Sequence, residues 1–275
     1  MDSDNRLFID PVLLELSKDP WCEEANKRVK DYFDCFYQEL KSGFNDTSLF
    51  EHAHEQNATK LGYGNGRNGK GKTKRGMYES LKKLSLLVQD IPTIDRAYDI
   101  PTLIEGFAED NMSDLLTNIL HEMLNQFTCE QMNLYGIQPQ GNLKFWTWNR
   151  EFSTWTLVER PSWFYDGREL LLVPKWIVRK NYLFKAHQYL YGVIIERIQV
   201  ENGWQDLTKY DIWQNMPRRT EHWEYETVVE YSKDNPHALI EYHNRIPYYY
   251  RRAHGQMTDE DLDIAIYGCV KTEVA

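Results

Sequence analysis

The chain of 275 residues carries 41% hydrophobic and 27% charged residues, a balance typical of globular proteins that excludes a disordered chain. This length can bury a substantial core, as one large domain or two small ones. The formal net charge of −10 repels nucleic acid as a whole, so any contact with phosphate requires a local basic patch.

Four cysteines, Cys22, Cys35, Cys129 and Cys269, form neither a CxxC pair nor a zinc-binding spacing. This usage predicts reduced thiols in a cytoplasmic protein. The first residues lack the basic start and apolar run of a signal peptide, and apolar runs such as 170–173 are too short to cross a bilayer. We therefore expect a cytoplasmic protein without a membrane span.

Helical periodicity dominates the first half of the chain. Apolar spacing predicts two helices between Pro11 and Leu40, with a break at Asp19-Pro20, and a further helix over 77–89. The longest predicted helix covers about 111–135, where seven apolar residues form a stripe and Gly136 is placed to end it.

Strand patterns follow in the second half. Alternating aromatic and β-branched residues predict a hairpin from 143–148 and 153–158, and 169–173 is a short apolar strand. Helical spacing returns over 184–200 and 220–245, and TDEDLDIAIYG predicts a capped helix near the end. The expected fold is α+β, mostly helical with a small central antiparallel sheet, divided into a helical region 1–140 and an α+β region 141–275.

A glycine-rich basic stretch occupies 57–76, with six glycines, six basic residues and no acid between Glu55 and Glu79. Such dense glycine predicts a mobile loop. Residues 66–73, GRNGKGKT, fit the spacing GxxxxGK[ST], but no strand is predicted before them, so a P-loop is not expected. Its cations within 60–75 are candidates for contact with nucleic acid, against the alternative of a solvated loop: Arg67, Lys70, Lys72, Lys74 and Arg75.

The segment 106–123 places Asp110, Asp114, Asn118 and His121 on one helical face. Two carboxylates and an imidazole in this arrangement could bind a divalent metal or act as acid and base, with Asp110, Asp114 and His121 as ligands. The alternative is that acids near a helix start cap its backbone and complement its dipole.

Lys175 follows the apolar strand directly, after Pro174, and is a third candidate for catalysis because a lysine there could neutralise a phosphate. Arg179, four residues later, is a further candidate for contact with nucleic acid. The alternative for Lys175 is that it caps the next segment. Histidine and serine patterns of zinc enzymes and hydrolases are absent from the sequence.

Five segments together resemble a bacterial family associated with restriction and anti-phage defence loci. They are FIDPVLL at 8–14, LGYGNGRNGKG at 61–71, EDNMSDLLTNIL at 109–120, LLLVPKWIVRK at 170–180 and YSKDNPHALIEYHN at 231–244. The resemblance implies a restriction-endonuclease-like core with an acid and a Glu-x-Lys on neighbouring strands, which binds Mg²⁺. Only twelve residues follow Asp263, and the single Glu-Leu-Lys at 39–41 lies in a predicted helix. This chain therefore departs from that catalytic pattern.

The sequence favours a regulatory or sensing module of a bacterial anti-phage defence system, acting beside a nuclease or ATPase partner. A second hypothesis is a Mg²⁺-dependent nuclease with Asp110, Asp114 and Lys175 in its site. A third is a structural subunit of a phage or host assembly.

Overall fold

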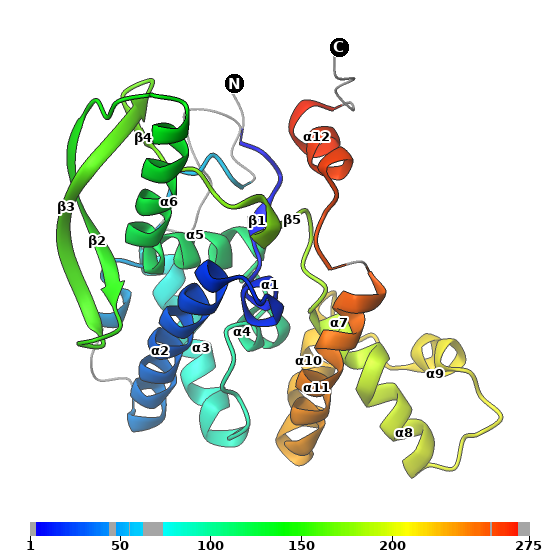
Figure 1. Ribbon diagram of the computed structural model, residues 1–275. Coiled ribbons are helices and arrows are strands. Elements are labelled where there is room, and N and C mark those ends of the chain that lie inside the picture. Colours follow the sequence, from blue (N-terminus) through cyan, green and yellow to red (C-terminus); the bar gives the residue numbers. More distant parts are fainter. Residues whose placement is uncertain (1–3, 44–47, 55, 63–73, 254, 269–275) are drawn as a thin grey trace.

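Figure 1 shows the computed structural model, which describes residues 4–43, 48–54, 56–62, 74–253 and 255–268, with the backbone alone for 74–81. The fold is α+β and mostly helical, as predicted, with one three-stranded and one two-stranded antiparallel sheet. The larger sheet is central in the sequence but lies at one side of the molecule, beside helix α6 (His121–Leu134).

The two N-terminal helices are those that the sequence predicts, α1 (Pro11–Leu16) and α2 (Pro20–Ser42). Each begins with an aspartate N-cap followed by proline, and the Asp10 and Asp19 carboxylates accept backbone N–H groups of the first turn. Helix α2 ends at Gly43 in a left-handed conformation.

The glycine-rich stretch is not a loop along its whole predicted length. Helix α3 (Lys74–Asp90) already includes Lys74 and Arg75, and a bridge joins Leu61 to Asn5. The Ala58 carbonyl accepts the N–H of Leu171. The predicted loop 57–76 is therefore wrong at its C-terminal end, where α3 begins, whereas 57–62 forms no helix or strand and is held by hydrogen bonds to Asn5 and Leu171. Residues 63–73 lie outside the described residues.

The predicted helix over 111–135 is two helices, α5 (Glu109–Ile119) and α6. The Thr147 hydroxyl from the sheet donates to the Ile119 carbonyl and accepts the Glu122 N–H, at 3.2 and 3.3 Å. A side chain inserted in the backbone ladder breaks a helix without any glycine or proline. Every residue of α5 except Asp110 is buried, so α5 is a central helix of the fold.

The predicted hairpin is confirmed as β2 (Gly141–Asn149) and β3 (Thr154–Tyr165), and the next strand is the shorter β4 (Arg168–Leu170). Trp146 pairs with Leu157 on the outer face, whereas Phe145 and Trp163 are buried. The second sheet joins β1 (Phe8–Ile9) to β5 (Val178–Arg179). Two short turns of 3₁₀ helix are η1 (Ser48–Phe50) and η2 (Lys175–Ile177).

The remaining elements are helical. They are α4 (Asp99–Leu103), α7 (Ala186–Tyr189), the π-helical turn η3 (Leu190–Ile194), α8 (Ile195–Glu201), α9 (Lys209–Asn215), α10 (Trp223–Asp234), α11 (His237–Arg252) and α12 (Asp259–Tyr267). The predicted helix over 220–245 is broken at Asn235-Pro236 because proline lacks the N–H that a helix interior needs. The capped helix near the end is confirmed, with a Thr258–Asp261 capping box.

One hydrophobic core runs through both predicted regions, 1–140 and 141–275. The Trp148 indole donates to Asp31 at 2.7 Å, and the Tyr250 hydroxyl donates to Asp10 at 2.5 Å. The composition change near residue 140 thus marks the start of the sheet. No helix in the described part of the chain is both long and apolar enough for a bilayer span.

Substitution of Gly62 by alanine is expected to lower the free energy of unfolding by about 1–3 kcal/mol. Gly62 has φ +133°, and an added Cβ would lie 2.5 Å from Oδ1 of Asp110. Gly203→Ala is the matched control, because Gly203 also has positive φ but no atom within 4 Å of the added carbon. Urea denaturation measures both variants, and equal losses would contradict a close approach at Gly62.

Candidate functional site

The helical face predicted from sequence binds three other segments of the chain. Asp110 lies against the backbone of Gly62, and the Asn118 amide donates to the His54 carbonyl at 2.6 Å. His121 is buried and pairs with Glu169 of β4 at 2.9 Å. Its ring stacks on Phe145 with centroids 3.9 Å apart. These polar residues therefore anchor chain segments to the central helices.

The predicted metal ligands Asp110, Asp114 and His121 do not come together as a three-ligand group. Among the described residues, the side chains that meet this condition are Asp95, Asp99 and His243. His121 already uses Nε2 for Glu169, and Asp114 is buried. The three expected donors therefore do not converge on one point in the described chain, and their binding of Mg²⁺ stays a prediction. The alternative was that acids cap the start of this helix. The N-cap of α5 is Ala108, which makes no side-chain hydrogen bond to the helix.

The other predicted residues also lie apart from one another. Lys175 is exposed in η2 and pairs with Asp259 of α12 at 2.6 Å, so it is not a side chain projecting from a strand end. Arg179 donates to carbonyls of Asn181 and Gly255, and its guanidinium lies 5.7 Å from the ring centroid of Tyr250. Arg179 thus has a structural use in the fold, and its contact with nucleic acid stays a prediction. The cations Arg67, Lys70 and Lys72 lie outside the described residues, as do the side chains of Lys74 and Arg75.

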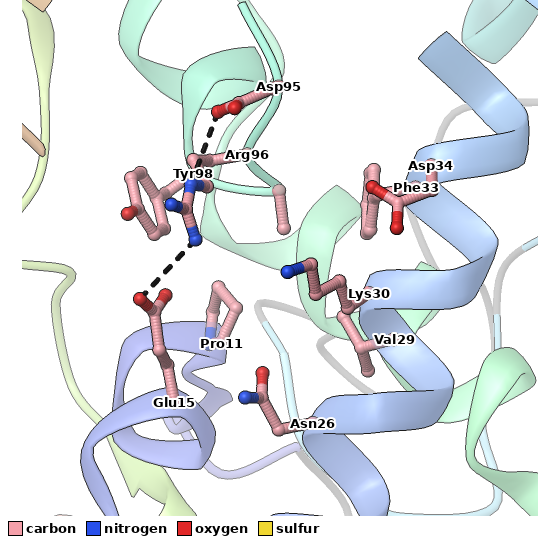
Figure 2. Close-up of a pocket in the computed structure, with 11 residues that line it drawn as sticks. Pro11, Glu15, Asn26, Val29, Lys30, Phe33, Asp34, Asp95, Arg96 and Tyr98 are labelled. Carbon is pink, nitrogen blue, oxygen red and sulfur yellow. Dashed lines mark ion pairs between the residues drawn. The ribbon is translucent and has the colours of Figure 1, made fainter. Parts of the chain in front are cut away.

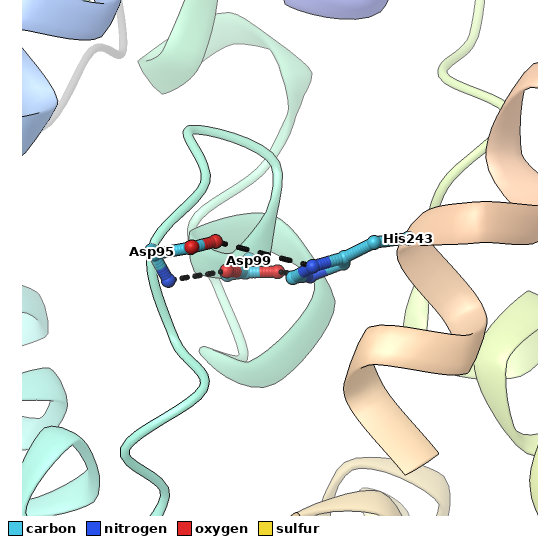
Figure 3. A group of neighbouring side chains, drawn as sticks. All are labelled: Asp95, Asp99 and His243. Atoms are coloured by element: carbon cyan, nitrogen blue, oxygen red, sulfur yellow. Dashed lines mark hydrogen bonds and ion pairs between the residues drawn. The ribbon is translucent and has the colours of Figure 1, made fainter. Parts of the chain in front are cut away.

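A buried carboxylate, Asp99, organises the segment before α4. Its Oδ2 accepts the backbone N–H groups of Asp95 and Arg96 at 3.0 and 2.8 Å, which fixes the turn. Its Oδ1 lies 2.6 Å from Nε2 of His243, which comes from α11 (Figure 3). Asp99 has no exposed surface. One side chain therefore holds both the turn and a distant helix.

The same three side chains could in principle bind a metal, but their hydrogen bonds favour an ion pair. His243 presents Nε2 to Asp99 and Nδ1 to Asp95, the latter at 3.9 Å, so the two carboxylates face opposite edges of one ring. Both Asp99 oxygens already accept hydrogen bonds. A doubly protonated imidazole satisfies this arrangement directly.

Burial disfavours the charged form of His243, but the Asp99 carboxylate outweighs it and raises the pKa of His243 above 6.5, with Asp95 adding to the effect. Arg96 opposes this shift, and the Tyr98 ring meets the imidazole edge-on at 5.4 Å. The folded state thus favours the imidazolium. His243 is expected to be largely charged at pH values where a free histidine is half neutral.

A cavity of about 440 Å³ adjoins this turn, between α1, α2 and residues 95–98 (Figure 2). Its apolar walls include Phe33 and Tyr98, both buried. The volume lies in the range of pockets that bind small molecules. The Tyr37 hydroxyl donates to the Arg96 carbonyl at 2.7 Å, which adds a second anchor to the turn. The turn at 95–98, which forms one wall of the cavity, is therefore held by Asp99 and by Tyr37.

Charged side chains of both signs reach the cavity. Lys30 and Arg96 approach it from opposite walls, as Figure 2 shows. Arg96 lies 3.5 Å from Glu15 and 3.1 Å from Asp95, whereas Lys30 has no ion pair with any described residue. Asp34, one turn after Lys30, adds a carboxylate to the same wall. Such a lining suits a small polar ligand that carries an anionic group.

Sequence reasoning missed Asp95, Asp99 and His243. Asp95 and Asp99 have the i, i+4 spacing of a helical pair, but Pro92 and a turn precede them. His243 is separated from Asp99 by 144 residues, and nothing local relates the two. The sequence signal available was the pair of aspartates before a short apolar segment.

These features define a mostly helical α+β protein with a charged cavity beside a buried Asp–His pair. The family model of a domain of unknown function, DUF8370, matches residues 1–185, and the chain belongs to this family. No curated protein and no solved structure matches the chain. The matched residues include the entire cavity lining, whereas His243 lies beyond them.

Proposed function

We propose that this protein is a regulatory component of a bacterial anti-phage defence system that senses a small polar ligand and signals to a nuclease or ATPase partner. The resemblance of five segments to defence-associated proteins supports the biological setting. The charged cavity supports the sensing role, since Lys30, which has no ion pair with any described residue, offers a cation on the wall that also carries Phe33.

The observation that carries the sensing role is the double use of Asp99. One of its oxygens holds the turn that lines the cavity, and the other holds His243 of α11. A ligand that contacts Arg96 therefore acts on a segment tied to the C-terminal helices. A ligand shifts a conformational equilibrium only through different contacts in the two states. The turn at 95–98 provides such contacts next to a helix that can report them.

Binding at the cavity is expected to depend on its two cations. In a thermal-shift screen of mononucleotides and amino acids, we expect a phosphate- or carboxylate-bearing compound to raise Tm. Lys30→Gln and Arg96→Gln are each expected to weaken its binding about tenfold, because a hydrogen bond to a charged group contributes about 1.5 kcal/mol. Lys27→Gln is the matched control, since this exposed lysine of the same helix does not line the cavity. Equal affinity in all variants would contradict the cavity as the sensor.

Two further measurements separate sensing from its biological use. Hydrogen exchange should show altered protection of α11 on ligand binding, and His243→Gln should abolish that change while binding persists. In cells with the native locus, Lys30→Gln should reduce protection against phage. Protection that is unaffected by Lys30→Gln would contradict the proposed defence role, even if ligand binding in vitro were lost.

The basic stretch remains a proposed contact with nucleic acid, through Arg67, Lys70, Lys72, Lys74 and Arg75. A nuclease is the second candidate, favoured by the contact of Gly62 with Asp110, which places the start of this stretch against the predicted acidic face. Its test is cleavage of single- and double-stranded substrates with Mg²⁺ or chelator. Metal-dependent cleavage lost in Asp114→Asn would replace the sensing proposal with an enzymatic one.

A further inference from the structure

A second cavity, of about 530 Å³, lies between the last turns of α2, the short helix η1 and one end of the β2–β3 hairpin. It is separate from the proposed sensing cavity, with which it shares no lining residue. Its walls combine aromatic side chains with two carboxylates, Glu39 and Glu51. The aromatic residues are His52, Trp146, Trp148 and Trp155. We call it the aromatic groove.

The aromatic rings of the groove are held in fixed positions. His52 stacks parallel to Trp146 with ring centroids 4.1 Å apart and meets Trp155 edge-on at 5.5 Å. The Trp155 indole N–H donates to the Leu49 carbonyl at 3.0 Å, so its ring cannot rotate freely. Trp146 keeps 39% of its surface exposed although it is large and apolar. The groove therefore presents preorganised ring surface to solvent.

The electrostatics of the groove are negative. No lysine or arginine is among the described residues that line it, and Glu39 and Glu51 both do. Glu51 forms no ion pair with the rest of the described chain. Helix α2 also ends beside the groove, and the C-terminal end of a helix carries a partial negative charge. Aromatic faces next to carboxylates attract organic cations.

From this chemistry we infer that the aromatic groove binds an alkylammonium group, supplied by a lysine side chain of a partner protein. The methylene chain of lysine packs against indole surface, and the ammonium group meets ring faces and a carboxylate. An anionic ligand would be repelled by Glu51, and no lysine or arginine among the described lining residues would attract it. A polyamine offers the same ammonium chemistry, so the test compares the two sources. This inference does not depend on the function proposed for the other cavity.

A lysine tetrapeptide is the probe, and its affinity is measured by isothermal calorimetry and tryptophan fluorescence at low salt. We expect saturable binding, and at least tenfold weaker binding of the same peptide with acetylated lysines, which keeps the length and removes the charge. Spermidine is the polyamine arm. Tighter binding of spermidine than of the tetrapeptide would overturn the assignment to a partner lysine.

Two variants test the site itself. Trp146→Leu removes the most exposed ring and Glu51→Gln removes an exposed carboxylate, and we expect affinity losses of about tenfold and about threefold. Phe152→Ala is the matched control, because this aromatic residue is 69% exposed on the same hairpin and does not line the groove. Circular dichroism establishes that each variant is folded. Wild-type affinity in both groove variants, or equal binding of the acetylated peptide, would overturn the inference.

Discussion

Replacement of Asp99 by alanine is expected to lower the free energy of unfolding by about 3–5 kcal/mol, because it leaves a buried charged partner without compensation. The substitution removes the acceptor for His243 and for the N–H groups of Asp95 and Arg96 at once. Asp99 has no exposed surface, so water cannot replace the lost carboxylate. Urea denaturation followed by circular dichroism measures the loss.

His243, the partner of Asp99, is expected to make the free energy of unfolding depend on pH. The pKa of His243 is higher in the folded protein than in the unfolded chain, so its stabilisation is fully present below pH 6.5 and is lost as pH rises through the folded-state value. His243→Gln is expected to flatten the stability curve above pH 6.5. NMR titration of the imidazole provides a direct check of the raised pKa.

The matched control for Asp99→Ala is Asp259→Ala, which removes a carboxylate from the exposed ion pair with Lys175. Exposed pairs contribute little, so the control should cost less than about 1 kcal/mol. Equal effects of the two substitutions would contradict the buried ion pair. A Tm that falls with chelator and rises again with Zn²⁺ would instead identify Asp95, Asp99 and His243 as metal ligands.

Local patterns in the sequence predicted the elements that local chemistry determines. The Asp-Pro starts of α1 and α2 supply both an N-cap acceptor and a fixed φ, and the capping box of α12 works in the same way. The alternation from 143 to 158 predicted a hairpin because one face of β2 and β3 is buried. These signals lie within a few residues of the structure they specify.

The errors have causes distant in sequence. Thr147 breaks the helix at Leu120, although 111–135 has uninterrupted helical periodicity. In the π-helical turn η3, Arg245 of α11 donates to the Gly192 carbonyl, and this turn interrupts the helix predicted over 184–200. Periodicity within one segment contains no information about such partners. The same limit explains why the sequence did not show that the predicted acidic face anchors other segments of the chain.

The candidate cavity was not predictable for the same reason. Its lining combines Glu15 of α1, Lys30 of α2 and Arg96 of a turn, and none of these residues belongs to a recognisable motif. The sequence did show that aromatic residues were unusually abundant, with nine tryptophans and eighteen tyrosines. Most of them lie in the core or pack against it, but Trp146 lies partly exposed in the aromatic groove. Only the fold distinguishes these two uses.

Asp10 provides the second large expected effect, a decline in stability as pH rises from about 4 to about 6. Burial raises the pKa of Asp10 from 3.8 to about 6, although the Tyr250 hydroxyl and the Val12 N–H both stabilise the carboxylate. The unfolded chain therefore loses its proton at lower pH than the folded protein does. The stabilisation is present below pH 3.8 and is lost as pH rises through the folded-state value, by about 3 kcal/mol in total.

Asp10→Asn separates this charge effect from packing. Asparagine keeps the N-cap acceptor for Val12 and can accept from Tyr250, yet it carries no charge to bury. We expect the variant to have a flat stability curve between pH 4 and pH 6 and to be at least as stable as the wild type at pH 7.

Tyr250→Phe should instead lower the free energy of unfolding by about 1–3 kcal/mol at pH 7, because it leaves a buried carboxylate oxygen of Asp10 without its donor. A wild-type pH slope in Asp10→Asn would show that another group titrates in this range. Asp10 changes stability below about pH 6, whereas His243 changes it above pH 6.5. Denaturation of Asp10→Asn and of His243→Gln across this pH range therefore assigns each part of the stability curve to one residue.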